Sequence, residues 1–257
     1  MMRFKSLGSG SSGNATLVQS TGSDPCNLLI DCGFGLKQMV QRLEKSGLLP
    51  GQLDAIFITH EHGDHTGCVQ ALSSQYNIAV WMSAGTATAM DFVNDSGLLN
   101  TASDGNVIEI KGLQLTPFTV PHDAREPLQL TCTDGSAKLG VLTDLGHATE
   151  HVFKQLQRCH ALLLESNHDT DVLAASIYPP FLKQRVGGQY GHLANSQAAD
   201  IAGSVLHSGL KHVVAAHLSQ QNNLPELVKN CLAQALSCHC DEILIATQND
   251  GCPWLTA

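Results

Sequence analysis

The sequence contains no hydrophobic run long enough to cross a membrane. A transmembrane helix needs about 20 consecutive apolar residues, and no stretch of the chain approaches that length. The first eight residues also lack the apolar core of a secretion signal and are typical of an immediate first strand. We therefore expect no membrane association and a cytoplasmic location.

Positive charge is scarce as well. The chain has 14 lysine and arginine residues against 23 aspartate and glutamate residues, so its formal net charge is −9 at pH 7. It has no long basic run and no aromatic stacking platform. These absences argue against broad, non-specific attraction to DNA. They do not exclude a nucleic-acid substrate, because the 13 histidines are counted as neutral and bound divalent ions would offset part of the negative charge.

No low-complexity linker and no tandem repeat divides the 257 residues. Hydrophobic residues make up 43% of the chain and charged residues 14%, which is typical of a globular protein rather than a disordered one. A chain of this length can bury a sizeable core. We therefore expect one domain over residues 1–257.

The nine cysteines are odd in number and scattered along the chain. Without an export signal, this pattern indicates reduced thiols, most of them acting as small buried hydrophobic residues. Cys238, His239 and Cys240 have the form of a metal clip, but no second cluster completes it. We favour packing over metal binding for these three residues.

The spacing of apolar residues predicts strands and helices that alternate, apart from a strand-rich stretch in the middle. The predicted strands cover residues 3–7, 15–19, 27–33, 54–58, 78–82, 106–110, 113–119, 127–133, 137–143, 161–165, 212–216 and 242–245. The predicted helices cover residues 35–46, 65–74, 84–94, 148–157, 178–185, 194–207 and 224–236. Each half mixes strands with helices, which favours two sheets packed face to face with helices outside. Periodicity alone does not determine that the sheets stack in this way.

The densest cluster of metal-ligand side chains follows the predicted strand 54–58. Residues 59–67 have the sequence Thr-His-Glu-His-Gly-Asp-His-Thr-Gly. Alternate residues of an extended segment point the same way, so His60 and His62 can reach one ion together. Asp64 and His65 lie where the chain turns into the next helix, and they can reach a second ion. A polar loop without metal is the less favoured interpretation, because H-x-H-x-D-H is dense and further ligand types occur downstream.

Three further polar residues each come directly after an apolar, strand-like segment. They are His122, Asp144 and His217. Strand ends at one edge of a sheet are where α/β proteins gather their sites. A single histidine in such a place is more often structural, but these three occur together with a complete H-x-H-x-D-H motif. We therefore interpret all three as metal ligands.

This pattern resembles that of the metallo-β-lactamase-fold hydrolases over nearly the whole chain. The family has an aspartate after an early strand, the H-x-H-x-D-H loop, and then a histidine, an aspartate and a last histidine, which here correspond to Asp31, His60, His62, Asp64, His65, His122, Asp144 and His217. The resemblance implies an α/β fold, an αββα sandwich of two mixed sheets with helices on both outer sides, and a dinuclear site along one edge. It also implies that His60, His62 and His122 hold one ion. The other ion would be held by Asp64, His65 and His217. Asp144 would bridge the ions, and Asp31 would orient the ligand loop from behind.

Five neutral imidazoles and two carboxylates suit Zn²⁺ best, with Mn²⁺ or Fe²⁺ as alternative occupants. Two such ions can share a hydroxide, lower the pKa of water and stabilise charge on the attacked group. The candidate catalytic residues are Asp64, which is also a ligand, together with Glu165 and His192.

Features outside the ligand set bear on the substrate. Residues 164–169 and 191–195 resemble segments of phosphodiesterase branches of the superfamily, which include ribonuclease Z and PhnP. This likeness implies that His192 approaches a phosphate oxygen or helps to protonate the leaving group, supported by Glu165. The alternative for His192 is a surface or helix-capping residue.

A closer resemblance is to the YycJ (WalJ)-type group of bacterial metallohydrolases. The matching segments are residues 7–14, 120–124, 143–146, 165–169, 191–195 and 217–223. The resemblance implies a cytoplasmic phosphodiesterase that acts on DNA as a 5′→3′ exonuclease. Ala194 stands where the group often carries serine, and it is not at a ligand position.

Four residues are candidates for phosphate contact. Ser11 and Asn14 belong to the glycine- and serine-rich loop 8–14, whose backbone can approach a phosphate closely. A flexible hairpin turn explains this loop equally well, and a Walker loop is excluded because the Gly-Lys-Ser/Thr ending is missing. Lys183 and Arg185 can reach a phosphate backbone near the site, although a solvated helix face explains them equally well.

Our hypothesis is a dinuclear metal-dependent phosphodiesterase that trims nucleic acid, with DNA as the first choice and a metal-bridging hydroxide as the nucleophile. One alternative is a small-molecule hydrolase acting on a cyclic phosphate, ester, thioester or lactone, which the acidic charge favours. Another is a metal-binding regulatory protein that no longer turns over, which the complete ligand set disfavours.

Overall fold

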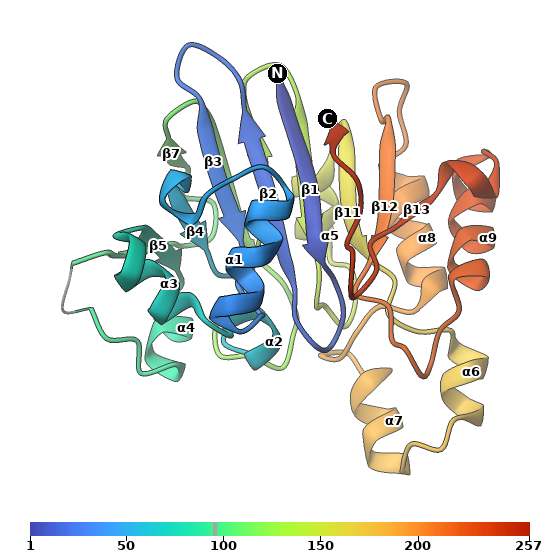
Figure 1. Ribbon diagram of the computed structural model, residues 1–257. Helices are drawn as coiled ribbons and strands as arrows, with labels where there is room; N and C mark the ends of the chain where they lie inside the picture. Colours follow the sequence, from blue (N-terminus) through green and yellow to red (C-terminus); the bar gives the residue numbers. More distant parts are fainter. Residues whose placement is uncertain (95–96) are drawn as a thin grey trace.

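Two mixed β-sheets of seven strands each lie face to face in the computed structural model, which describes residues 1–94 and 97–257 (Figure 1). Helices cover the outer face of each sheet. The αββα sandwich expected from the sequence is therefore confirmed.

The first sheet combines the N-terminal strands with the last strand of the chain. β1 lies between β14 and β2 and is antiparallel to both, and β3 is antiparallel to β2. From β3 onward, the strands β4, β5 and β6 run parallel, so their carboxyl ends meet at one edge. The spatial order is β14 (Leu255–Thr256), β1 (Met2–Gly8), β2 (Ala15–Ser20), β3 (Cys26–Ile30), β4 (Ala55–Phe57), β5 (Ala79–Met82) and β6 (Leu99–Thr101).

The second sheet has the same division into antiparallel and parallel parts. β7 to β10 form an antiparallel meander, and β10, β11, β12 and β13 run parallel. The spatial order is β13 (Leu244–Ile245), β12 (His212–Ala216), β11 (Ala161–Glu165), β10 (Lys138–Leu142), β9 (Leu128–Thr133), β8 (Leu113–Thr119) and β7 (Ile108–Ile110).

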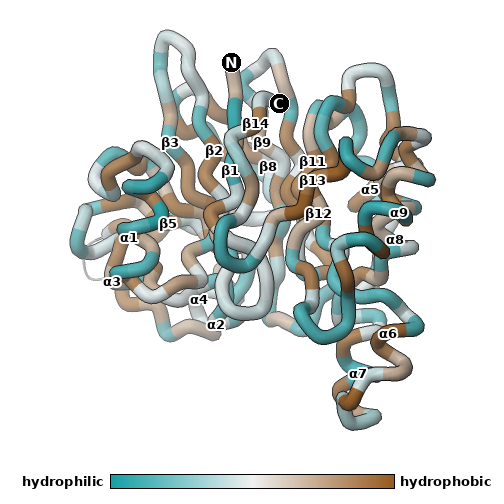
Figure 2. The backbone as a smooth tube through the Cα atoms, turned by 45° about the vertical axis from the view of Figure 1, so that its right-hand side comes forward, coloured by the Kyte–Doolittle hydropathy of each residue, from teal (hydrophilic) through white to brown (hydrophobic). Residues whose placement is uncertain are grey.

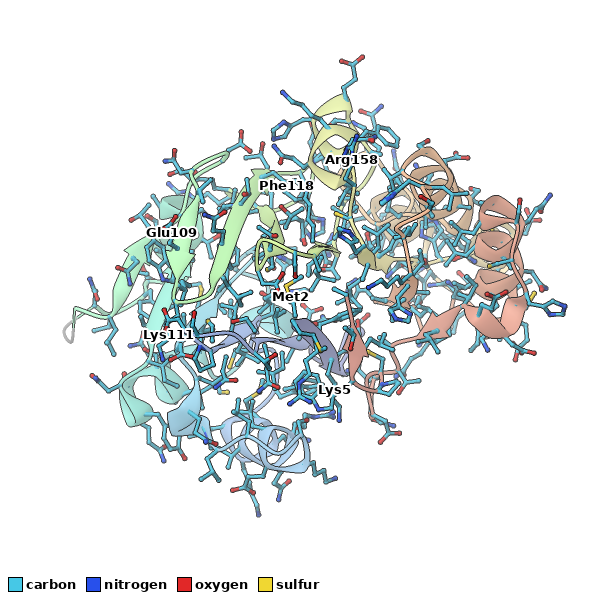
Figure 3. The ribbon with its side chains drawn as sticks, turned by 90° about the horizontal axis from the view of Figure 1, so that it is seen from above. Met2, Lys5, Glu109, Lys111, Phe118 and Arg158 are labelled. Carbon is cyan, nitrogen blue, oxygen red and sulfur yellow. The ribbon has the colours of Figure 1, made fainter. Side chains whose placement is uncertain are left out.

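Both faces of the central strands are buried, which explains why their sequences are almost continuously apolar. In β3, Leu28 belongs to the core between the sheets and Leu29 to the core beneath the helices. In β11, Leu163 and Leu164 divide in the same way. Successive side chains of a strand point to opposite faces, so each strand supplies two cores. Figure 3 shows Met2 in the core between the two sheets.

The helices divide between the two outer faces. α1 (Leu36–Lys45), α3 (Val69–Tyr76) and α4 (Ala84–Ala89) cover the first sheet, and α5 (Glu150–Leu156), α8 (Asn195–Ser204) and α9 (Pro225–Leu236) cover the second. α1 buries Met39 and Leu43, which are one turn apart and so share a face. Two further helices, α6 (Thr170–Ala175) and α7 (Pro180–Val186), project from one end of the sandwich (Figures 1 and 2). Within the described part of the chain, no helix is long and apolar enough to cross a bilayer.

The predicted helix over residues 65–74 is wrong as a single element. The structure has a short helix, α2 (Gly63–Thr66), and then α3, separated at Gly67. A Cβ atom at Gly67 would lie 2.7 Å from the Cys32 carbonyl oxygen, because the chain passes close against the loop that follows β3. This close approach interrupts the helix and brings the ligand loop against Cys32.

Other differences concern short elements. The predicted helix 84–94 ends at Ala89, and Asp91 takes a left-handed conformation with φ 47° that turns the chain away. The strands β6 and β14, the helix α6 and the 3₁₀ turns η1 (Pro50–Gln52) and η2 (Cys240–Glu242) were not predicted. The strands β6 and β14 have three and two residues, too few to carry a periodicity, so only the neighbouring strands define them.

Candidate metal centre

The candidate ligands gather where parallel strands of both sheets end. Asp31 follows β3 and the ligand loop, residues 59–67, follows β4. Asp144, Glu165 and His217 lie at or just beyond the ends of β10, β11 and β12. These ends meet because β3 and β4 are parallel to each other, as are β10, β11 and β12. In Figure 1 this edge faces down, where α2 lies.

Three of these residues have a left-handed backbone conformation. The φ angle is 61° at Asp31, 56° at Asp144 and 54° at His217. This region costs about 1–2 kcal/mol for an ordinary L-residue, although aspartate and histidine enter it more readily than most. Such strain persists only where the surroundings hold it, and it is concentrated at functional sites. Here it ends each strand abruptly and leaves a polar side chain at the edge.

Three imidazoles form the first candidate ligand group. His62 Nδ1 lies 3.0 Å from His60 Nε2 and 3.3 Å from His122 Nε2. A tetrahedral zinc ion with Zn–N bonds of about 2.0–2.1 Å separates its ligand nitrogens by about 3.3 Å. His122 Nδ1 donates to the Gly191 carbonyl oxygen at 3.0 Å, and His60 Nδ1 donates to the Thr59 hydroxyl at 3.0 Å. The Nε2 lone pairs of His60 and His122 therefore face the group, which is the form in which imidazole binds metal.

The second candidate group contains Asp64, His65 and His217. Asp64 Oδ2 lies 3.6 Å from His65 Nε2 and 3.4 Å from His217 Nε2. His65 Nδ1 donates to Asp31 Oδ2 at 2.7 Å, and His217 Nδ1 donates to Glu165 Oε1 at 3.0 Å. Both Nε2 atoms are therefore available as metal ligands. Asp31 takes the orienting position that the sequence comparison with the hydrolase family implied.

Asp144 lies between the two groups. Its Oδ2 atom is 2.9 Å from His65 Nε2, yet within the described chain no hydrogen-bond donor satisfies this buried oxygen. Because His65 Nδ1 already donates to Asp31, the positive charge that balances Asp144 Oδ2 must lie at His65 Nε2, either as a second proton on the ring or as a bound cation. The donor set, imidazole nitrogens with carboxylate oxygens, therefore fits divalent metal ions of the zinc type.

The electrostatics agree with this fit. Burial and the neighbouring His65 imidazole hold the pKa of His60 well below its usual value, so His60 is neutral at pH 7. Burial alone would raise the pKa of Asp144, but His217 and His65 outweigh it and lower that pKa well below its usual value. Burial would lower the pKa of His65, but Asp144 and Asp31 outweigh it and raise that pKa well above its usual value. The buried carboxylates thus favour positive charge at this edge.

Glu165 joins the metal groups to His192. Its Oε1 atom accepts hydrogen bonds from His192 Nδ1 at 2.8 Å and from His217 Nδ1 at 3.0 Å. Its Oε2 atom accepts from the backbone N–H groups of Leu145 and Leu193 at 3.0 and 3.1 Å. Burial would raise the pKa of Glu165, but His192 outweighs it and the pKa falls to about 2. Burial would lower the pKa of His192, but Glu165 outweighs it and the pKa rises to about 9. Glu165 therefore holds two histidines and has no free oxygen for substrate.

A pocket of about 380 Å³ opens over these groups. It is lined by Ser11, His62, Gly63, Asp64, Asp123, Asp144, Tyr178, Leu182, Arg185, Val186, Gly191, His192 and His217. His192 is partly buried, and because its Nδ1 is bound to Glu165, its Nε2 is the atom free to meet a ligand in the pocket.

The four candidate phosphate contacts divide into two pairs. Ser11 and Arg185 line the pocket, and Arg185 Nε lies 2.7 Å from Asp123 Oδ2 in an exposed ion pair. Lys183 does not line it, because its ammonium group donates to the Ala174 carbonyl oxygen. Asn14 is buried, and its amide oxygen accepts from the Gly10 N–H group while its Nδ2 lies 3.2 Å from His65 Nε2. Asn14 thus connects loop 8–14 to the ligand loop.

Sequence reasoning missed three residues at this site. Thr59 donates from its backbone N–H group to Asp31 Oδ1 at 2.9 Å and accepts from His60 Nδ1, so it orients two members of the site. Asp123 Oδ1 lies 3.4 Å from His122 Nε2, and Tyr178 lines the pocket. Direct adjacency to His60 and His122 was the available signal for Thr59 and Asp123.

The Cys238–Cys240 segment lies outside this site. Cys238 and Cys240 are partly buried against the core beneath the second sheet, and the Cys240 thiol donates to Asn230 Oδ1. Among the described residues, the groups able to hold a metal ion do not include either cysteine. This supports packing as their role.

Comparison with known proteins places the chain in a family. The model of the beta-lactamase superfamily domain matches residues 26–217. The chain belongs to the beta-lactamase superfamily. A superfamily relative, exodeoxyribonuclease YycJ from Bacillus anthracis, is 31% identical over 242 residues, which are 91% of this chain and 89% of the relative. The resemblance to the YycJ-type group is therefore confirmed, and the chain is a metallo-β-lactamase-fold hydrolase related to that group.

Solved structures of superfamily members share the fold. The metallo-β-lactamase-fold protein YhfI from Bacillus subtilis aligns over 100% of both chains with a TM-score of 0.78 and 16% identity. The short form of human tRNase Z aligns over 99% of this chain and 98% of its own, with a TM-score of 0.67 and 18% identity. At these identities the likeness extends to the fold alone.

Proposed function

We propose that residues 1–257 act as one domain and form a dinuclear metal-dependent phosphodiesterase, a 5′→3′ exonuclease on DNA. The observation that carries the proposal is His192, which is fixed at Nδ1 by Glu165 and borders the pocket beside both candidate ligand groups. We also propose a cytoplasmic location. The relative YycJ, named as an exodeoxyribonuclease, supports DNA and exonuclease action for a chain of similar length.

The candidate ligands account for two ions, with zinc as the first choice and manganese or iron as alternatives. His60, His62 and His122 would hold one, and Asp64, His65 and His217 the other, with Asp144 within reach of both. When bound, the ions lower the pKa of water and stabilise negative charge on a phosphate.

The residues around the ions orient the substrate and exchange protons with it. His192 donates its Nε2 proton to the leaving oxygen, because its Nδ1 proton is already directed to Glu165. Glu165 stabilises the protonated form of His192 and keeps the ring in place. Arg185 and Ser11, at the pocket wall, bind a non-bridging phosphate oxygen. The Arg185–Asp123 pair is exposed and therefore weak, so a phosphate can compete for the guanidinium.

Two observations favour a second candidate, a small-molecule phosphodiesterase on the same scaffold. The pocket of about 380 Å³ is in the range of small-ligand sites, and the net charge of −9 opposes a polyanion. A metal-binding protein without turnover has less support, because His192 lies outside the two proposed ligand sets and borders the pocket.

A substrate panel separates these functions. Single- and double-stranded DNA with 5′-phosphates, RNA, bis(p-nitrophenyl) phosphate and a lactone are each incubated with protein loaded with Zn²⁺ or Mn²⁺. We expect mononucleotides from DNA and no lactone hydrolysis. Turnover of the small diester without any from DNA would select the second candidate, and lactone turnover alone would reject phosphodiester chemistry.

His192→Ala tests the role of the imidazole. We expect kcat on DNA to fall about 100- to 1,000-fold, the loss typical of a missing general acid, with metal content unchanged. His239→Ala is the matched control, because His239 is an exposed histidine distant in sequence from every ligand. An unchanged kcat in His192→Ala would contradict the role of His192 as the proton donor.

A further inference from the structure

An arm made of residues 170–190 leaves apolar side chains uncovered beside the pocket. It consists of α6, α7 and the segments that follow each helix. Figure 1 shows α6 and α7 projecting beyond the sandwich at the end where α2 lies. No residue of α7 is buried, although the helix contains Phe181, Leu182 and Val186. A helix with this composition normally covers its apolar side chains against a partner.

The exposed apolar side chains of the arm are large. Ile177 is 93% exposed, Phe181 72% and Tyr190 61%. Figure 2 shows hydrophobic colour along α7 at the tip of the arm. Contiguous exposed apolar groups with a polar rim mark interaction sites more often than single exposed residues do.

The exposed groups continue the wall of the pocket. Tyr178, Leu182, Arg185 and Val186 line the pocket from α7 and the segment before it. Phe181 precedes Arg185 by four residues, so the two side chains are neighbours on one face of α7. The apolar surface therefore starts at the catalytic pocket and extends outward along the arm.

The occupant of this surface must combine apolar faces with negative charge. Arg185 and Lys183 lie on α7 among the exposed apolar residues, and Arg185 is 62% exposed. An unpaired polynucleotide strand has this composition, because its bases stack on apolar and aromatic side chains while its phosphates meet cations. A duplex hides its base faces and is held mainly by many phosphate contacts. A chain with 14 cationic and 23 acidic residues is poorly suited to that mode.

We propose that the arm holds the unpaired nucleotides next to the scissile phosphodiester, with bases against Phe181, Ile177 and Tyr190 and the backbone at Arg185. This inference rests on the proposed phosphodiesterase function. It adds a binding mode, in which the protein holds the strand by its bases and the strand enters the pocket unpaired.

The test compares an arm variant, Ile177→Ala with Phe181→Ala, and a matched control, Leu49→Ala with Val107→Ala. The control residues are also exposed, 60% and 55%, but line no part of the pocket. We measure kcat/KM on a 5′-phosphorylated 12-mer of thymidine and on bis(p-nitrophenyl) phosphate, which is too short to reach the arm. We expect the arm variant to lose about tenfold on the 12-mer, equal to about 1.4 kcal/mol, and nothing on the small diester. Phe181→Tyr should retain the wild-type rate on both.

Salt dependence gives a second readout. Binding of the labelled 12-mer, measured by fluorescence anisotropy, should weaken with salt at a slope of about −0.7, as expected for one phosphate contact, at Arg185, to a single strand. Arg185→Gln should reduce the slope by about 0.7. A steep slope in the wild type would indicate many phosphate contacts and overturn base-held binding.

Failure of this inference differs from failure of the proposed function. If the wild-type protein cleaves the 12-mer and the arm variant cleaves it equally fast, the arm does not hold the strand. Another outcome is that light scattering shows a dimer for the wild type and a monomer for the arm variant, while both cleave the 12-mer equally fast. In that case the arm binds a second copy of the chain and the inference is wrong. If metal-loaded wild type cleaves no diester, the proposed function fails, and anisotropy of wild type against arm variant still decides whether the arm binds the strand.

Discussion

The ligand loop and the arm both border the pocket, yet they are built in opposite ways. In the loop, His60 and His65 are fully buried, and each has one ring nitrogen bound to a fixed partner. In the arm, α7 buries no residue, and Ile177 is almost fully exposed. The loop is held by buried contacts, whereas the contacts of α7 with the rest of the protein are at the surface, such as the Arg185–Asp123 pair. This difference indicates that the chemistry is preorganised and that substrate selection is left to surfaces completed on binding.

The largest expected effect is in the metal centre. Asp144→Asn removes the charge that both ligand groups share, while asparagine still accepts the left-handed φ of 56°. We expect hydrolysis to fall by about 10³-fold. Metal content by mass spectrometry should also fall below that of wild type. Asp200→Asn on the exposed face of α8 is the matched control. Full activity in Asp144→Asn would contradict the assignment of Asp144.

The packing behind the loop provides the next effect. A Cβ atom at Gly33 would lie 1.7 Å from the Asp64 carbonyl oxygen, whereas one at Gly35 would meet nothing within 4 Å. Gly33→Ala should therefore destabilise the protein by about 3 kcal/mol, a fall in Tm of several degrees. Gly35→Ala should leave Tm nearly unchanged. Differential scanning calorimetry measures both Tm values. Equal values for the two variants would show that the ligand loop moves to accept the Cβ atom at Gly33 and would contradict tight packing there.

The hydrogen bond from His65 to Asp31 allows a finer test of preorganisation. Asp31→Asn keeps the shape and the left-handed backbone but removes the charge at 2.7 Å from His65 Nδ1. Loss of such an orienting partner lowers metal affinity by about 10- to 100-fold. We therefore expect activity to be lost at limiting Zn²⁺ and regained at excess Zn²⁺. A variant that needs no additional metal would show that His65 is oriented by other contacts.

The smallest effect is expected in the arm. Ile177→Val should change the free energy of unfolding by less than about 0.5 kcal/mol, because the side chain is 93% exposed. The same substitution at the fully buried Ile56, at the base of the ligand loop, should cost about 1 kcal/mol. Denaturant titration of both variants checks the contrast. A similar cost at both positions would mean that Ile177 packs against something within the protein.

Local patterns in the sequence were sufficient for most strands and for the candidate ligands, whereas the stacking of the two sheets was implied by the family resemblance. The apolar runs of β3, β4, β10, β11 and β12 fix where strands end, and parallel strand ends bring Asp31, His60, Asp144 and His217 to one edge. Strand type and ligand type are properties of short segments, so spacing and composition report them directly. Elements shorter than this pattern, such as β6 and β14, were missed because only their neighbours create them.

The tertiary structure alone decided how these residues act. It directs the Nδ1 protons of His65 and His122 to Asp31 and to the Gly191 carbonyl, which leaves Nε2 for metal. It places Lys183 on a backbone carbonyl rather than at the pocket. It also leaves Phe181 exposed although the residue is apolar. Ring orientation, hydrogen-bond partners and burial depend on residues far apart in the chain, so no local pattern contains them.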